Sequence, residues 1–307
     1  MPHYYIRLLG PETRDGRVAG PALLEVLRVL VDGARRVVRL RLEGRSTARG
    51  PAPAWLGQAS DFTVVALREG SALIVLEADE IQDAAEALGQ IPMFETLGAD
   101  ATGLSLLRES VEEAIEGRAE SDLLDDGVLE VIEGWTRVFS HGVTEAEFGT
   151  ATNSVTRITS GRLDNVARPR KQTPPPQRVR VAGWLDLIRH SDRMFTLKLE
   201  SGSTLRGVAE GVGAEKLAGL FGKKAVVSGL AVFRPSGRVL RIEADDVEPA
   251  TDDFSLWSRE PRPVLAEART EALRKPQGPR SGLAAIVGAW PGDEPDRVVA
   301  AALKELS

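Results

Sequence analysis

A chain of 307 residues is too long for one typical hydrophobic core, and its 42% hydrophobic and 27% charged residues are those of a globular protein. The absence of cysteine excludes disulfides, thiolate nucleophiles, iron–sulfur clusters and zinc sites with a cysteine ligand, and it predicts a reducing, cytoplasmic location. No signal-peptide pattern opens the sequence, and no apolar stretch approaches the ~20 residues of a membrane helix, so we expect no membrane association.

The N-terminal 168 residues mix strand and helix patterns. Residues 3–9 predict a strand, and apolar residues at helical spacing predict a helix from Gly20 to Gly44, although residues 38–42 also alternate as a strand would. The runs 62–67 and 71–76 predict a β-hairpin that is apolar on both faces and therefore lies in the core. Two amphipathic helices, 104–117 and 123–139, complete a predicted α+β module over residues 1–168.

Residues 169–177 carry four prolines, which predicts a stiff linker. Residues 178–250 then follow the order β-β-β-α-β-β, which is that of an OB-fold, a small five-stranded barrel with a helix at one end. Another small barrel with the same strand order is the alternative. We expect Gly183 at a sharp bend of the first strand, with Val179, Val181, Leu185 and Leu187 inside the barrel and Leu217, Leu220 and Phe221 on the helix that closes it.

Charge is distributed unevenly along the chain. Residues 178–243 carry twelve basic and six acidic side chains, a local charge of +6 that leaves −12 for the rest of a chain whose net charge is −6. This asymmetry predicts that the barrel faces an anionic partner, either nucleic acid or an acidic protein surface, including other parts of this chain. A solvated surface of mixed charge is the alternative. Only seven of the 39 basic residues are lysine, which is typical of a GC-rich bacterial genome.

OB-like barrels bind single strands by combining basic side chains with exposed aromatic rings. If Val181 and Leu185 point inward, Trp184 points outward on the same face as Arg180. Covering a domain interface is the alternative role of Trp184. The candidate nucleic-acid-binding residues are Arg180, Trp184, Arg206 and Arg241.

The sequence shows no pattern of an active site. The three histidines, His3, His141 and His190, are too far apart along the chain for a metal motif, and no phosphate-binding loop or nucleophile elbow occurs. The acidic run with Asp122, Asp125 and Asp126 lacks the spacing of a calcium loop and favours a helix N-cap instead. We therefore expect no enzyme activity, no cofactor and no metal.

The C-terminal part consists of a Pro- and Arg-rich linker, residues 251–281, and a final segment, residues 282–307. The Trp-Pro-Gly-Asp-Glu motif at 290–294, followed by a helix that ends in Leu-Lys-Glu-Leu-Ser, resembles the tail of antitoxin-like proteins paired with PIN-domain (VapC-type) toxin ribonucleases. The OB-like module, marked by RVRVAGWLDLIRHSDRMFTLKLESG, also resembles the barrel of uncharacterised bacterial proteins associated with such loci. Residues 1–168 lack the DNA-binding motifs of short antitoxins.

This resemblance implies an antitoxin that neutralises a PIN-domain toxin partner through its tail, by burying an aromatic anchor and a helix face in the toxin. The implied contact residues are Trp290, Pro291, Gly292, Asp293, Glu294, Val299, Leu303 and Leu306. The alternative is that this helix packs on the chain's own N-terminal module. The predicted fold class is a multi-module α+β protein with an OB-like barrel and a C-terminal helical tail. The alternative function is binding of single-stranded nucleic acid.

Overall fold

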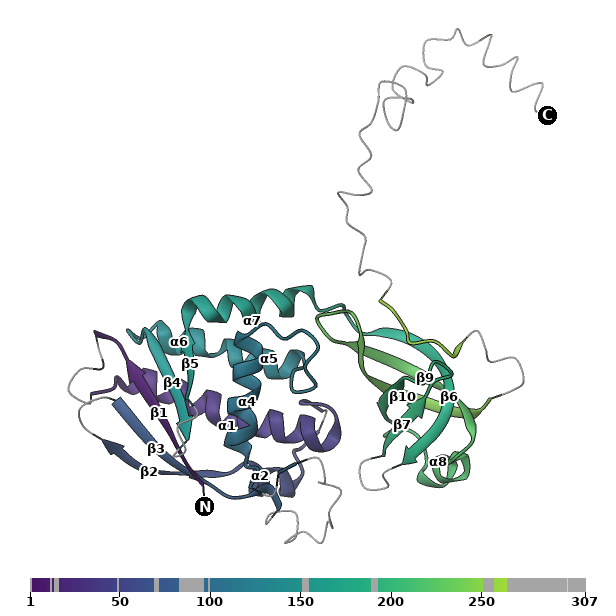
Figure 1. Ribbon diagram of the computed structural model, residues 1–307, viewed down its shortest axis with the longest axis horizontal. Helices are drawn as coiled ribbons and strands as arrows, with labels where there is room; N and C mark the ends of the chain where they lie inside the picture. Colours follow the sequence, from purple (N-terminus) through teal and green to yellow (C-terminus); the bar gives the residue numbers. More distant parts are fainter. Residues whose placement is uncertain are drawn as a thin grey trace. The chain divides into compact units, whose positions relative to one another are not determined.

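The computed structural model describes residues 2–11, 13, 17–48, 50–68, 72–82, 97–98, 100–150, 155–188, 193–250, 257–263 and 297 (Figure 1). The contacts divide the chain into two units, Met1–Pro263 and Val264–Ser307, and every element named below belongs to the first. The tail residues implied by the toxin resemblance all lie outside the described residues, as does most of the predicted linker 251–281.

An antiparallel five-stranded sheet forms one layer of the N-terminal region, in the order β2-β3-β1-β4-β5. Its strands are β1 (His3–Leu9), β2 (Phe62–Arg68), β3 (Ala72–Ala78), β4 (Glu145–Thr150) and β5 (Val155–Thr159). The predicted strand over residues 3–9 and the predicted hairpin are confirmed. β4 and β5 were not predicted, because each is short and β4 carries two glutamates within its six residues.

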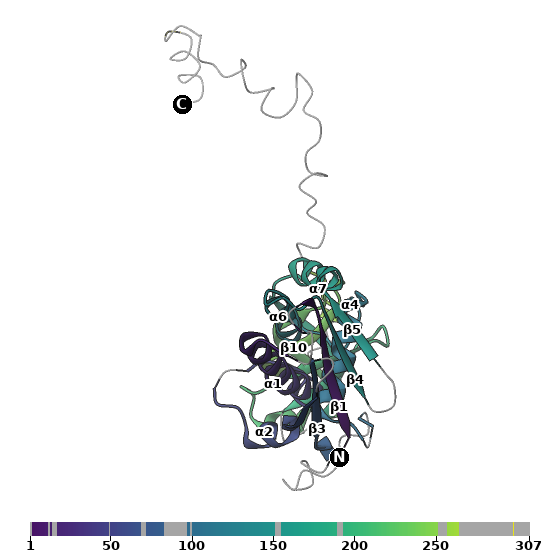
Figure 2. The same cartoon turned by 90° about the vertical axis from the view of Figure 1, so that its left-hand side faces the viewer.

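Helices gather on one face of this sheet (Figure 2). They are α1 (Gly20–Glu43), α2 (Ala54–Ser60), α4 (Gly103–Ile115), α5 (Asp126–Glu133), α6 (Trp135–Phe139) and α7 (Ser160–Gln172). α1 has its predicted bounds and ends at Gly44, whose φ of 72° is left-handed and suits glycine. The strand alternative for residues 38–42 is wrong, and the predicted helix 123–139 is two short helices that meet at Gly134.

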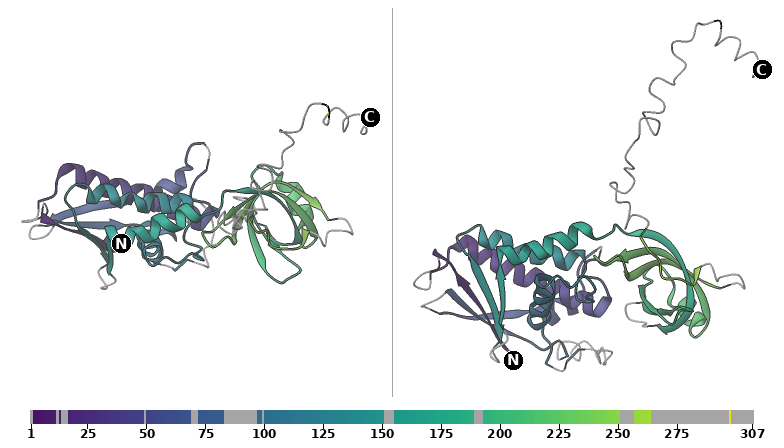
Figure 3. Two further views of the ribbon diagram at one scale, coloured as in Figure 1. Left: turned by 90° about the horizontal axis from the view of Figure 1, so that it is seen from above. Right: turned by 45° about the horizontal axis from the view of Figure 1, so that its top comes forward.

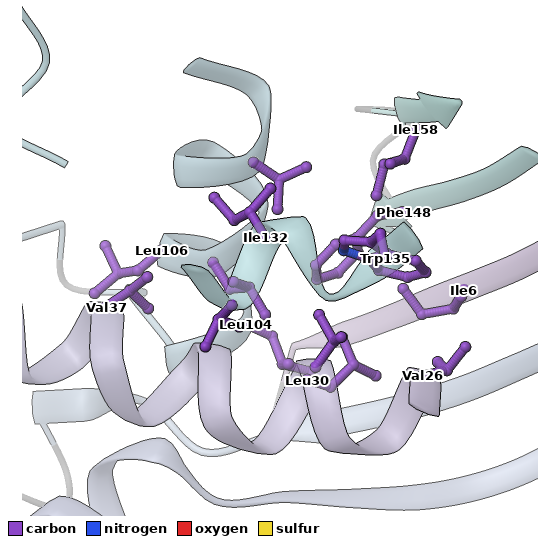
Figure 4. Close-up of a cluster of buried hydrophobic side chains, with 14 of the residues drawn as sticks. Ile6, Val26, Leu30, Val37, Leu104, Leu106, Ile132, Trp135, Phe148 and Ile158 are labelled. Atoms are coloured by element: carbon purple, nitrogen blue, oxygen red, sulfur yellow. The ribbon is translucent and has the colours of Figure 1, made fainter. Parts of the chain in front are cut away.

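The core of the N-terminal region lies between the sheet and the helices (Figure 4). Ile6 and Phe148 come from the sheet, Leu30 and Leu104 from α1 and α4, and Trp135 lies beside Phe148. All five side chains have an exposed fraction of 0%. Burying an aliphatic or phenyl side chain to this extent contributes about 1.5–3 kcal/mol, so this cluster holds the region together.

The hairpin is only partly in the core. β3 buries every second side chain, but β2 exposes Val64, Val65 and Leu67 by 42%, 50% and 61%. The prediction of a fully buried hairpin is therefore wrong for β2. β2 lies at the edge of the sheet and has a register shift between Val64 and Ala66, so its side chains do not alternate regularly between the two faces.

Residues 177–249 form a closed barrel of five strands (Figure 3). The elements follow the predicted order: β6 (Gln177–Ile188), β7 (Met194–Lys198), β8 (Thr204–Val208), α8 (Ala214–Leu220), β9 (Lys224–Phe233) and β10 (Val239–Pro249). Around the barrel they run β6-β7-β8-β10-β9, and β10 is parallel to β8 but antiparallel to β9. At Gly183, β6 passes close to the backbone of β7. A Cβ atom at this position would lie 2.5 Å from the carbonyl oxygen of Lys198.

Two side chains assigned to the barrel interior lie outside it. Val181, Leu185, Leu217 and Leu220 are buried as predicted, and Val179 packs partly buried against the core. Leu187 is 44% exposed, because a register shift between Leu185 and Leu187 reverses the faces of β6 at that point. Phe221 is 58% exposed, because α8 ends at Leu220, one residue before it.

The predicted linker between the two regions is short in the structure. α7 continues through Pro169 to Gln172, and β6 begins at Gln177. Because Thr159 caps the start of α7 and Arg170 near its end pairs with Asp126 and Glu133, the helix is fixed at both ends. The two apolar cores are separate clusters, yet both lie within the single compact unit Met1–Pro263.

Candidate functional site

The outer face of β6 carries an exposed tryptophan between two lysines. Trp184 is 36% exposed, and its partners in the flanking strands are Lys198 of β7 and Lys224 of β9. The Nζ atom of Lys224 lies 4.6 Å from the centroid of the indole ring, within cation–π range. The outward orientation of Trp184 is as predicted, since its neighbours Gly183 and Leu185 are buried.

A second tryptophan lies over the same strand. The Cζ atom of Arg180, four residues before Trp184 on β6, is 5.8 Å from the centroid of Trp257, which is 42% exposed. Trp257 belongs to a segment after β10 that is bound to the barrel. Glu260 of this segment accepts a hydrogen bond of 3.3 Å from the amide of Val239, the first residue of β10. Arg180 also forms an ion pair of 3.7 Å with Glu248.

Together these residues form a row, which we call the tryptophan row: Arg180, Trp184, Lys198, Lys224 and Trp257. Arg180 and Trp184 are separated by about 13 Å along β6 at the usual rise of an antiparallel strand. Leu187 extends the row on β6. The turn after α8, which contains Phe221, lies next to β6, because the Gly222 amide donates a hydrogen bond of 2.8 Å to the carbonyl of Leu185. Ala182, which lies between Arg180 and Trp184 on this face, is buried, so the row has two separate exposed ends at which planar rings and anions can be bound.

The structure brings only two of the four predicted nucleic-acid candidates together. Arg180 and Trp184 share β6, whereas Arg206 lies on β8, 3.8 Å from Asp122, and Arg241 lies on β10. The Arg241 side chain is 8% exposed and pairs with Asp125 at 3.3 Å and Glu243 at 3.0 Å. Arg241 is therefore a structural residue of the folded chain.

Sequence reasoning missed three members of the row. Strand alternation could have placed Lys198 and Lys224 outward, but only the register shows that both flank Trp184. Trp257 gave no such signal, because an irregular segment has no periodicity that fixes its place.

The anionic partner predicted from the charge asymmetry is, in part, the chain's own loop before α5. Asp125 caps α5 by accepting from the Val128 amide at 3.0 Å, as predicted, and also accepts from the Ser46 amide at 3.0 Å and pairs with Arg241. Asp122 accepts a hydrogen bond from Arg234 at the β9–β10 turn. These contacts join the N-terminal region to the barrel.

A further ion pair joins the two regions beyond this loop. Arg45, just after α1, donates a hydrogen bond to Glu210, which follows β8. This hydrogen bond lowers the pKa of Glu210 below its usual range, and that of Arg45 is raised for the same reason. Both ends of the pair therefore stay charged at neutral pH.

Two depressions lie elsewhere, on the N-terminal sheet. One of about 380 Å³ is on the open face of the sheet and is lined by His3, Tyr4, Tyr5, Arg7, Arg68, Leu73 and Val75. Another of about 450 Å³ lies between the ends of β1 and β4 and the start of α4. Two of the lining side chains pair with strand neighbours, His3 with Glu77 at 3.3 Å and Arg7 with Glu147 at 3.5 Å. Such pairing favours a structural role for these groups.

Within the described part of the chain, no group of three or more histidine, aspartate or glutamate side chains could hold a metal ion. None of the helices described there is both long and apolar enough to cross a membrane. Comparison of the chain with protein-family models, curated proteins and solved structures finds no match.

Proposed function

We propose that the protein binds single-stranded nucleic acid on the tryptophan row of an OB-like barrel. The strand order β6-β7-β8-β10-β9, the parallel pairing of β8 with β10 and the helix between the third and fourth strands are the arrangement expected of an OB-fold. Barrels of this kind bind about 4–16 nucleotides on their outer surface.

The observation that carries the proposal is that two exposed tryptophans each lie within cation–π range of a basic side chain of the barrel. Trp184 of β6 lies beside Lys224 of β9, and Trp257 lies beside Arg180 of β6. An indole face stacks on any base and contributes about 1–3 kcal/mol per base, whereas the adjacent cation attracts the phosphate backbone. Lys198 and Lys224 are two of only seven lysines in the chain, and both are strand partners of Trp184. Binding without base-specific hydrogen bonds is therefore expected.

Fluorescence anisotropy with a labelled oligothymidylate at low salt tests this function. Trp184→Ala and Trp257→Ala should each weaken binding by about 1–3 kcal/mol, which is about 5- to 150-fold. Trp184→Phe should retain most of the affinity, because it keeps a stacking ring. Leu24→Ala, which removes a 57% exposed side chain of α1, is the control and should bind as the wild type does. Equal affinity of wild type and both alanine variants would refute the proposal.

A second candidate function is neutralisation of a PIN-domain toxin by the tail. The observation that favours it is the resemblance of the Trp-Pro-Gly-Asp-Glu motif at 290–294 to the tail of antitoxin-like proteins. Trp290 is the proposed anchor, and Leu303 and Leu306 are proposed to fill a groove in the partner.

Co-expression with a PIN-domain ribonuclease from the same genome tests this second function. We expect full-length protein to restore growth and co-purify with the toxin, and we expect a chain that ends at Ser281 to fold but do neither. Trp290→Ala should weaken the complex by about 2–4 kcal/mol. Rescue by the truncated chain would remove the support for this function.

A further inference from the structure

The outer surface of the barrel continues from the tryptophan row onto β8. Trp184 pairs with Lys198 on β7, and Lys198 pairs with Thr204 on β8. Arg206 lies two residues after Thr204 and therefore on the same side of β8. Since neighbouring strands are about 4.8 Å apart, β8 is about 10 Å from β6 around the barrel. A strand of nucleic acid that leaves Trp184 across β7 reaches Arg206 next.

Arg206 belongs to a cluster of three arginines that carboxylates already contact. Asp122 lies 3.8 Å from Arg206 and accepts a hydrogen bond from Arg234, whereas Glu120 lies 3.8 Å from Arg234 and 3.7 Å from Arg238. Both carboxylates come from the loop that joins α4 to α5. Arg206 and Arg238 remain 59% exposed, so they can contact further anions.

We propose that Arg206, Arg234 and Arg238 form a phosphate-binding surface and that Glu120 and Asp122 occupy it as built-in competitors. This inference rests on the proposed nucleic-acid function and adds the regulation of that site. A guanidinium binds carboxylate and phosphate oxygens through the same planar donors, so a carboxylate stands in for a backbone phosphate. A tethered loop competes at an effective concentration of the order of mM, so it limits binding of a dilute strand.

Glu120 and Asp122 can move away from the arginines because another residue of the loop, Asp125, holds it in place. Asp125, only 4% exposed, holds the loop through Arg241, the Ser46 amide and the cap of α5. Glu120 and Asp122 are 55% and 44% exposed, where ion pairs contribute about 0–1 kcal/mol each. Phosphates can therefore displace these two carboxylates while Asp125 stays in place.

The test compares two double variants with the same change in charge. Glu120→Gln with Asp122→Asn removes the competitors, and Glu113→Gln with Glu116→Gln removes two carboxylates that pair with Arg118 at the end of α4. If the loop covers the arginines in about nine of ten molecules, the first variant binds a labelled oligothymidylate about tenfold more tightly than wild type. Because Glu260 still lies 3.6 Å from Arg238, we expect two new phosphate contacts, at Arg206 and Arg234, which steepen the slope of log affinity against log salt by about 1.4. The second variant should match the wild type.

Adding Arg206→Gln to the first variant should reverse the gain, whereas Arg118→Gln should not. Equal tightening by both double variants would overturn the inference, because net charge alone would explain it. If wild-type binding depends on Trp184 but the first variant does not bind more tightly, the inference fails and the proposed function stands. If neither wild type nor variant binds at low salt, both fail.

Discussion

The N-terminal region and the barrel bury their apolar side chains in different ways. In the N-terminal region helices cover one face of a sheet, so the other face and the β2 edge stay open, whereas the barrel closes on itself and gives every strand two neighbours. The two apolar clusters share no residue, and arginine–carboxylate pairs such as Arg241–Asp125 join the regions. Each region is thus stabilised by hydrophobic burial, and the joint between them largely by charge.

The largest effects should come from cavities within either core. Phe148→Ala in the N-terminal region and Phe195→Ala in the barrel should each lower the free energy of unfolding by about 3–5 kcal/mol, because both rings are at most 1% exposed. Urea unfolding measures this, with Leu24→Ala as a surface control. If the two regions unfold separately, each variant should shift the transition of its own region. A single transition shifted equally by both would show that the regions unfold together.

At the joint, Arg241→Leu should lower the free energy of unfolding by about 3 kcal/mol. The change leaves the Asp125 carboxylate, 4% exposed, without its cation. Arg118→Leu, which removes the ion pairs of a 57% exposed arginine with Glu113 and Glu116, should leave the free energy of unfolding nearly unchanged in the same assay. If the two losses are equal, the buried pair is not what stabilises the joint.

These differences also mark how far the sequence alone predicts the fold. The order of the barrel elements and the bounds of α1 were predictable, because alternation, helical spacing and the pair Pro21 and Gly44 are local signals. The outward face of Leu187 was not, since a one-residue register shift in β6 leaves no mark in the pattern.

The candidate site was predictable to a smaller extent. Strand alternation placed Trp184 and Arg180 on one face. It could not show whether Arg241 binds a phosphate or pairs with a buried carboxylate of this chain, as it does in the structure. Long-range contacts such as Arg241 with Asp125, 116 residues apart, depend on tertiary packing rather than on local pattern. The charge asymmetry predicted an anionic partner for the barrel, with other parts of this chain as one of several candidates.

A smaller effect is expected at the start of α4, inside the N-terminal region. The Thr102 hydroxyl accepts from the Ser105 amide at 3.0 Å and donates to the Tyr4 hydroxyl at 2.8 Å, while the Ser105 hydroxyl accepts from the Thr102 amide. Thr102→Ala should therefore cost about 1–2 kcal/mol of unfolding free energy. Tyr4→Phe, which removes only the hydroxyl contact, should cost less. If Thr102→Ala leaves the free energy of unfolding unchanged, the capping hydrogen bonds contribute no stability beyond that of side-chain packing.

The pair of Arg45 and Glu210 makes the joint sensitive to acid. Because the folded-state pKa of Glu210 is lowered, its contribution is complete above its unfolded pKa of about 4.3 and is lost as the pH falls through the folded value. Glu210 is 61% exposed, so Glu210→Gln should cost under about 1 kcal/mol at neutral pH. Stability curves of wild type and variant should converge once the pH has fallen below the folded-state pKa of Glu210. A difference that persists in acid would assign the effect to something other than this charge.

The smallest change in stability should come from the two edges of the sheet. β2 exposes Leu67 by 61%, and its neighbours Val64 and Val65 add to an apolar edge, whereas β5 presents Arg157, 66% exposed, beside Val155 at the opposite edge. A charged side chain discourages edge-to-edge pairing between molecules, and β2 has none between Phe62 and Leu67.

Leu67→Lys should therefore change the free energy of unfolding by no more than about 0.5 kcal/mol and yet slow aggregation measured by light scattering on heating. Val155→Lys is the matched control, because it adds the same charge at an edge that Arg157 already protects, and its aggregation rate should stay close to that of the wild type. If both lysines slow aggregation equally, net charge is the cause. The β2 edge then has no special part in self-association, and the contrast between the open sheet and the closed barrel concerns stability alone.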